Sequence, residues 1–92
     1  MEIKFKVERM YKFQDNPTMK AFVDVAVNDV LIFKGVRVIQ GQKALFVTMP
    51  QEQGKDKRWY DVIRITSPDV RDELTRIVLE EYNQGQISDI GR

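Results

Sequence analysis

The sequence predicts an α+β fold, in which an antiparallel five-stranded sheet is followed by one C-terminal helix. Two observations lead to this prediction: the first two-thirds of the chain holds five short segments with strand patterns, and the last third changes to a helical period. The chain has 92 residues, of which 42% are hydrophobic and 32% charged, and this is typical of one globular domain. We expect a single domain over residues 1–84 and a flexible C-terminal tail over residues 85–92.

Each predicted strand is bounded by residues that favour turns. The five segments are residues 3–8, 19–27, 31–39, 44–49 and 58–65. Asn28 and Asp29 predict a two-residue hairpin turn between the second and third strands, because both residues tolerate a positive φ. Gly35 lies inside the third strand, where a glycine indicates a β-bulge or a close approach of another backbone. For Trp59, in the fifth strand, we favour the role of a core residue that anchors the strand.

The helix is expected over residues 68–83. Ser67, Pro68 and Asp69 form a typical helix start, because the serine can cap free amides, proline suits the first helical position and aspartate complements the helix dipole. Five apolar residues then share one stripe of the helix: Val70, Leu74, Ile77, Val78 and Tyr82. Gly85 predicts the end of the helix, since glycine accepts the left-handed backbone found just beyond helix ends.

The predicted sheet has two apolar faces and only one helix to cover them. Five strands span about 19 Å, whereas a helix with its side chains is about 10–12 Å wide. One face carries Val23, Val25, Phe33 and Leu45, and the other carries Phe22, Ala26, Ile32, Phe46 and Val62. A monomer would expose a large apolar patch, and such patches mark interfaces. We therefore predict a homodimer that covers this surface.

The composition argues against an enzyme. The chain has no cysteine and no histidine, which excludes thiolate chemistry and removes the commonest general base. Ser67 is better explained as a helix cap, and the glycines and carboxylates lack the spacing of phosphate or metal loops. We expect no metal, no cofactor and no small-molecule substrate. We also expect a cytoplasmic protein without a membrane partner, because no apolar run is long enough to span a bilayer and residues 1–10 alternate charges, unlike a signal peptide.

Positive charge is concentrated locally, although the net charge is only +1. Lys55, Lys57 and Arg58 lie within four residues and lead directly into Trp59 and Tyr60. Basic side chains can neutralise phosphates and aromatic rings can stack on unpaired bases, so this segment is a candidate nucleic-acid contact. The pattern supports a solvated loop about equally well. Further cations that could extend the patch are Arg37, Arg64 and Arg71.

Six segments of the chain carry a resemblance to a known family. They are Met19-Lys20-Ala21, residues 36–41 (VRVIQG), residues 45–50 (LFVTMP), Tyr60-Asp61-Val62, Ile65-Thr66-Ser67 and residues 78–82 (VLEEY). At this spacing they resemble the SpoVG family (stage V sporulation protein G, septation protein). The resemblance covers most of the chain, from the first strand to Tyr82.

The resemblance implies a small bacterial regulator that is homodimeric and has an antiparallel sheet with a C-terminal helix. Members bind DNA, and in some cases RNA, and are linked to septation during sporulation and to control of surface or virulence genes. In the family, binding is attributed to basic residues after the Met-Pro dipeptide and around the helix. Here Gln51, Glu52 and Gln53 follow that dipeptide, and the positive charge comes later in the same segment.

Two functions therefore remain open from the sequence. The first is a nucleic-acid-binding regulator, for DNA and in some cases RNA, that acts as a homodimer. Its expected phosphate contacts are Lys55, Lys57, Arg58, Arg37, Arg64 and Arg71. The second is a protein–protein adaptor at the division septum that does not bind nucleic acid directly.

Overall fold

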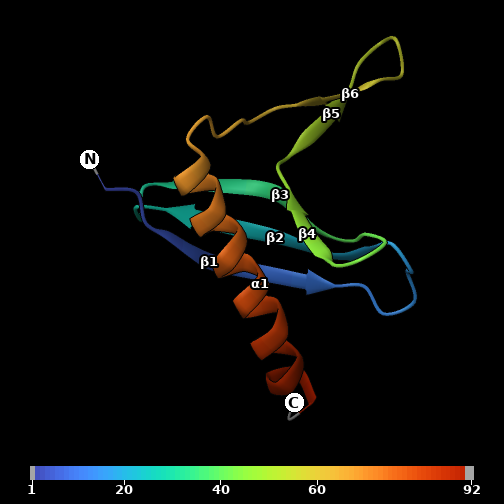
Figure 1. Ribbon diagram of the computed structural model, residues 1–92, viewed down its shortest axis with the longest axis vertical. Coiled ribbons are helices and arrows are strands. Elements are labelled where there is room, and N and C mark those ends of the chain that lie inside the picture. The colour runs from blue at the N-terminus through green and yellow to red at the C-terminus, as the bar shows by residue number, and fades with distance from the viewer. Residues whose placement is uncertain (1, 91–92) are drawn as a thin grey trace.

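Four strands form one antiparallel sheet in the computed structural model, which describes residues 2–90 and the side chains of residues 2–84. In spatial order they are β1 (Phe5–Lys12), β2 (Met19–Val27), β3 (Leu31–Gln40) and β4 (Leu45–Thr48). A separate antiparallel pair follows, made of β5 (Gln51–Gln53) and β6 (Trp59–Asp61), and then the helix α1 (Pro68–Ile90), as Figure 1 shows. The predicted α+β class, with an antiparallel sheet and one C-terminal helix, is confirmed.

The prediction of five strands in a single sheet is wrong. Instead of pairing with the main sheet over residues 58–65, the chain forms a strand only at β6, and β6 pairs with β5. β6 pairs with the neighbouring β5 because a tight turn closes the hairpin. In this turn the backbone nitrogen of Gly54 donates to the backbone oxygen of Arg58 at 2.8 Å. At the other end, the Val62 nitrogen donates to the Pro50 oxygen at 2.9 Å. The hairpin therefore forms from near neighbours in sequence, at a low cost in loop closure.

The turn and the bulge predicted around the third strand are both present. Asn28 and Asp29 have φ values of 52° and 57°, the left-handed backbone of a type I′ hairpin turn. The register of β2 and β3 shifts between Val23 and Val25, opposite Gly35. Gly35 has a φ of +87°, which only glycine adopts without strain. The bulge keeps the core-facing residues of β3 in register with those of β2.

The core lies between the main sheet and α1. Its fully buried members are Ala21, Val23, Val25, Val36, Val38, Leu74 and Val78. The helix begins as predicted, because the Val70 nitrogen donates to Ser67 Oγ at 3.4 Å and the Arg71 nitrogen to the Ser67 oxygen at 3.0 Å. The predicted apolar stripe of the helix is the face that packs on the sheet.

The predicted helix end is wrong, since α1 continues through Gly85 to Ile90. A glycine inside a helix costs only about 1 kcal/mol relative to alanine, and no proline follows to stop the helix. The predicted flexibility of residues 85–92 stays a prediction, because residues 91–92 and the side chains of residues 85–90 lie outside the described part of the chain. None of the described helices is long and apolar enough to cross a membrane.

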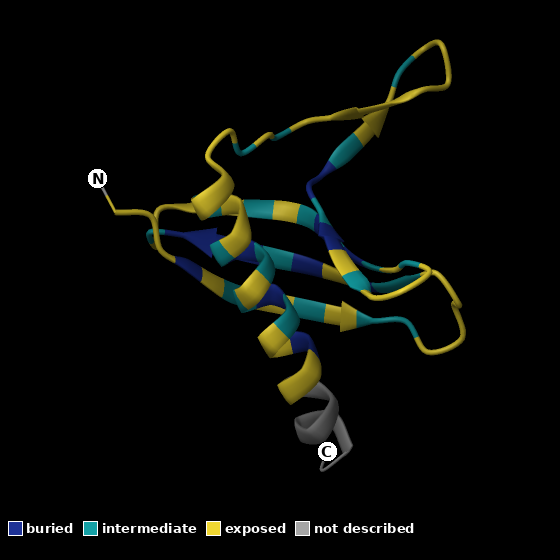
Figure 2. Ribbon diagram, in the orientation of Figure 1, coloured by how far each residue is buried: buried dark blue, intermediate teal, exposed yellow. Residues whose placement is uncertain are grey.

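No element of the described chain covers the face of the main sheet opposite α1 (Figures 1 and 2), and we call it the outer face. It carries apolar side chains together with charged ones such as Asp24 and Arg37. Phe22, Ile32 and Phe46 are 40%, 50% and 45% exposed, as predicted for side chains pointing away from the core. Ala26 is buried between its neighbours on β1 and β3. The placement of Val62 on this face is wrong, because Val62 follows β6 and lies outside the main sheet. The homodimer stays a prediction.

Candidate nucleic-acid interface

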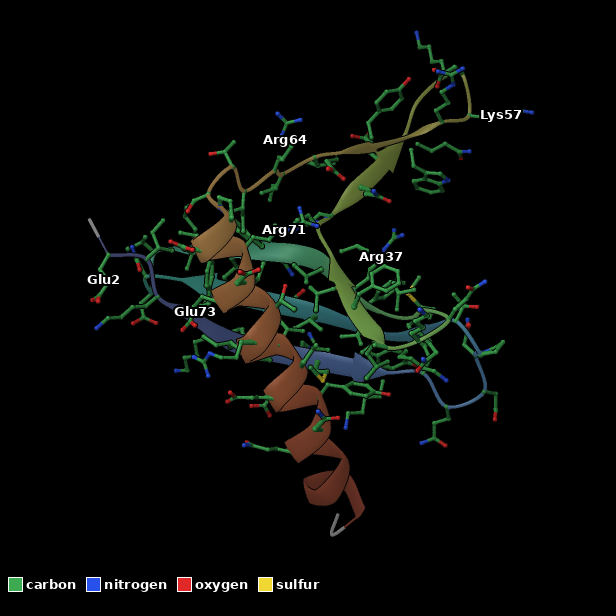
Figure 3. All side chains as sticks on the ribbon, in the orientation of Figure 1. Glu2, Arg37, Lys57, Arg64, Arg71 and Glu73 are labelled. Carbon is green, nitrogen blue, oxygen red and sulfur yellow. The ribbon has the colours of Figure 1, made fainter. Side chains whose placement is uncertain are left out.

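Residues 51–61 form a two-stranded projection, which we call the arm. It extends away from the main sheet and from α1 (Figure 1). At its tip, the backbone nitrogen of Lys57 donates to the backbone oxygen of Gly54 at 3.0 Å, and Lys57 has a φ of 68°. Gln53 Nε2 donates to the Lys57 oxygen at 3.1 Å and closes the turn further. Because of this tight turn, Lys55, Lys57 and Arg58 all lie at the end of the arm, and Figure 3 shows Lys57 there.

Tyr60 fixes the shape of the tip. Its hydroxyl donates to Asp56 Oδ2 at 2.5 Å, while the backbone nitrogen of Arg58 donates to Asp56 Oδ1 at 3.0 Å. The ring lies against Gly54, where an added Cβ would come within 2.8 Å of Tyr60 Cε2. The hydrogen bond from Tyr60 lowers the pKa of the Asp56 carboxyl and raises the pKa of the Tyr60 phenol. The aspartate among the basic residues therefore acts as a structural acceptor within the turn.

Trp59 is exposed, so its predicted role as a core residue is wrong. Its side chain is 55% exposed because β6 pairs with β5 and not with the main sheet. The Cζ atom of Arg37, on the outer face, lies 5.8 Å from the Trp59 ring centroid and 5.7 Å from that of Phe22. Both distances are within the range of a cation–π interaction. The base of the arm is thus linked to the main sheet through one guanidinium.

Arg64 lies on the segment that leads from the arm back to α1 (Figure 3). It borders an open hollow of about 580 Å³, together with Gln51, Trp59, Tyr60 and Asp61. Gln51 Nε2 donates to Asp61 Oδ1 at 3.0 Å, which holds these two polar side chains together at the base of the arm. The hollow therefore combines aromatic rings, a cation and hydrogen-bonding groups.

The structure brings five of the six predicted cations to the arm and its base. The sixth, Arg71, lies in the first turns of α1. None of the six cations is within 4.0 Å of a carboxylate oxygen in the described part of the chain. In contrast, Arg76 binds Glu73 and Glu80 at 2.7 and 2.5 Å. The arm and its base therefore hold five cations without an ion-pair partner, while Lys6, Arg9 and Lys43, which also have none among the described residues, lie elsewhere.

Sequence reasoning missed the hollow and the exposure of Trp59. The signal that could have located both is the short spacing from Pro50 to Val62, with Gly54 near its middle, which fits a local hairpin. No group of three or more potential metal ligands occurs among the residues that the structure describes. The groups that the site offers are cations, aromatic faces and hydrogen-bonding side chains.

Comparison with known proteins identifies the family. The SpoVG family model matches residues 1–84. A relative from Archaeoglobus fulgidus is 34% identical over 76 residues, which is 83% of this chain and 89% of the relative. One from Lachnospira eligens is 31% identical over 78 residues (85% and 89%), and one from Staphylococcus carnosus is 32% identical over 76 residues (83% and 71%). Each is named "Putative septation protein SpoVG". The chain therefore belongs to the SpoVG family.

Proposed function

We propose that this SpoVG-family chain is a cytoplasmic nucleic-acid-binding regulator that acts as a homodimer in gene regulation linked to septation. The observation that carries the proposal is the cluster of exposed, unpaired cations on a projecting arm beside an exposed tryptophan. The proposed phosphate contacts are Lys55, Lys57 and Arg58 at the tip, Arg37 and Arg64 at the base, and Arg71 on α1.

The tip is suited to phosphate because its cations have no internal competitor. The one carboxylate inside the turn, Asp56, already accepts hydrogen bonds from Tyr60 and from the Arg58 nitrogen. A cation without an ion-pair partner loses only hydration when it contacts a phosphate, and it releases condensed counterions from the nucleic acid. Binding through the tip is therefore expected to depend steeply on salt.

The helix is a poor alternative surface for nucleic acid. Arg76 is held by Glu73 and Glu80 on the same side of α1, and the exposed Asp69, Asp72 and Glu81 add negative charge. Phosphates would be repelled by this surface. If α1 takes part, it does so through Arg71 near its start, as a single contact that supplements the arm.

The outer face supports the homodimer. Phe22, Ile32 and Phe46 leave an apolar surface on a sheet face without a covering layer. A second copy placed there would bury this surface, with Arg37 left at the edge of the interface, and would bring two arms into one assembly. Two arms double the number of phosphate contacts and so raise both affinity and salt dependence.

A binding titration at several salt concentrations tests the proposal. The triple variant Lys55→Ala, Lys57→Ala, Arg58→Ala should lower affinity about tenfold or more at low salt, and should reduce the slope of log K against log salt by about 2–3. The control is the triple variant Lys4→Ala, Lys43→Ala, Arg76→Ala, which removes as many positive charges from positions outside the arm and outside the strands of the main sheet. It should bind almost as the unchanged chain does.

Two results would contradict the proposal. If both triple variants lose the same affinity, the arm is not the site and only net charge matters. If the unchanged chain shows no salt-dependent binding to DNA or RNA, the function is that of a protein–protein adaptor at the division septum.

A further inference from the structure

We propose that the arm takes single-stranded nucleic acid, with one unpaired base stacked on Trp59 and its flanking phosphates held by Arg37 and Arg64. The inference rests on the proposed function and specifies its ligand. It concerns the base of the arm, whereas the phosphate contacts of the tip serve single strands and duplexes alike.

Trp59 is the aromatic side chain of the arm that is free to stack. Tyr60, its neighbour, is already engaged, because its ring lies on Gly54 and its hydroxyl is bonded to Asp56. Trp59 forms no such contacts: among the described residues, its ring interacts only with the Arg37 guanidinium. An exposed indole on a strand beside cations is the arrangement by which proteins hold unpaired bases.

Arg37 supplies a positive charge next to Trp59 that no carboxylate of the described chain pairs with. Its Nε atom is buried and has no hydrogen-bond partner in the described part of the chain. The guanidinium is held between the Phe22 and Trp59 rings, so its position is fixed while its donors stay unused. Because Nε is buried, an added acceptor would have to bind the terminal nitrogens of the guanidinium. A phosphate next to a base on Trp59 would give the guanidinium a charged acceptor at its accessible edge.

The hollow beside Trp59 has room for a nucleotide. Its volume of about 580 Å³ lies within the range of about 300–1,000 Å³ that small-molecule sites show. Arg64 provides positive charge at its border, and the Gln51–Asp61 pair offers a donor and an acceptor to the edge of a base. Asp61 would repel a phosphate, so the base enters this side and the phosphate faces the arginines.

A duplex cannot use these features, because its bases are stacked on one another and present only their edges. A two-stranded projection can enter a major groove, but that mode would employ the tip and leave Trp59 and the hollow without a ligand. The exposed ring at the base of the arm therefore favours a single strand.

Trp59 is the only tryptophan of the chain, so its fluorescence reports directly on stacking. The unchanged protein is titrated with oligothymidylate of about 16 nucleotides and with a duplex of the same length. We expect quenching and tighter binding with the single strand. Trp59→Leu should weaken binding to the single strand between about fivefold and 150-fold and leave the duplex nearly unchanged. Trp59→Phe should restore part of the affinity, and Val62→Ala, which trims another exposed side chain next to the arm, should have no effect.

The outcomes separate this inference from the proposed function. Equal or tighter binding of the duplex, with Trp59→Leu neutral, overturns the single-strand inference and leaves the phosphate-binding arm intact. If the chain binds neither oligothymidylate nor the duplex, the proposed nucleic-acid-binding function itself is wrong. If Trp59→Leu and Trp59→Ala convert a dimer into monomers in sedimentation, Trp59 belongs to the subunit interface and the inference is also overturned.

Discussion

The guanidinium of Arg37, on β3, lies 5.8 Å from the ring centroid of Trp59, on β6. The two strands belong to different sheets, so this contact joins the arm to the body of the protein. A charged side chain in this place stabilises the arm only modestly, by about 0.5–1 kcal/mol for an exposed cation–π contact. The arm is therefore held in position without being locked, which suits a segment that has to accommodate a ligand.

Replacing Arg37 should loosen the arm. Arg37→Met keeps an unbranched apolar side chain against Phe22 but removes the positive charge that faces the Trp59 ring. We expect faster local motion of Trp59, measured as lower fluorescence anisotropy, with little change in the midpoint of thermal unfolding. Arg64→Met serves as the control, because the Arg64 guanidinium lies over no aromatic ring among the described residues. Equal anisotropy in both variants and in the unchanged chain would show that Arg37 does not restrain the arm.

The turn at the tip should respond to pH at two extremes. The pKa of Asp56 is lowered from its ordinary 3.8 by the Tyr60 hydroxyl and the Arg58 nitrogen. Its contribution to the turn is therefore present above pH 3.8 and is lost as the pH falls through the lowered pKa. The pKa of Tyr60 is raised from 10.0 by the bond to Asp56. Its contribution is present below pH 10.0 and is lost as the pH rises through the raised pKa.

Substitution of Tyr60 tests this pairing. In Tyr60→Phe the pKa of the Asp56 carboxyl should rise toward 3.8 while remaining below it, since the bond from the Arg58 nitrogen persists. The measurement is an NMR titration of the Asp56 carboxyl carbon. The Asp61 carboxyl, titrated in the same samples, is the internal control. An unchanged Asp56 titration would show that the hydroxyl does not donate to it in solution.

The stability of the fold should depend on the contact between α1 and the sheet. Leu74 is 1% exposed in the core, whereas Leu31, at the start of β3, is 58% exposed. Leu74→Ala should lower the free energy of unfolding by about 2–5 kcal/mol, and the matched Leu31→Ala by less than about 1 kcal/mol. Urea denaturation followed by circular dichroism measures both. Similar losses in the two variants would contradict the placement of the core.

A charge on the outer face should prevent dimer formation. Ile32 is half exposed on this face, and burying an aspartate in its place against a second copy would cost several kcal/mol because the carboxylate would lack a partner. Ile32→Asp should therefore sediment as a monomer at concentrations where the unchanged chain is a dimer. Val30→Asp, at an exposed position of the preceding turn, should not alter the association. A dimer that persists in Ile32→Asp would place the interface elsewhere.

Most of the fold could be predicted because its signals are local. The alternation along β2, the residues Asn28 and Asp29, and the Ser67-Pro68-Asp69 helix start each determine their own geometry, and all were confirmed. The strand after residue 57 could not be assigned correctly from its pattern. The apolar pattern of residues 58–65 predicts a strand. It does not tell whether this strand pairs with the main sheet or with residues 51–53, just before the turn.

The site was predictable in its charges and not in its geometry. The run from Lys55 to Arg58 identifies a basic segment, yet its display at the end of an arm follows from the β5–β6 pairing. The same pairing exposes Trp59, which by composition alone looks like a core residue. The contact of Trp59 with Arg37 depends on the fold of both sheets and leaves no local signal in the sequence.

The most direct measurement of the central claim is a hydrogen–deuterium exchange footprint of the unchanged chain with bound oligothymidylate. The account predicts that protection of backbone amides appears over residues 51–64, and that the amides of α1 around Glu73 and Glu80 are unaffected. Protection confined to α1, with unchanged exchange along the arm, would contradict it.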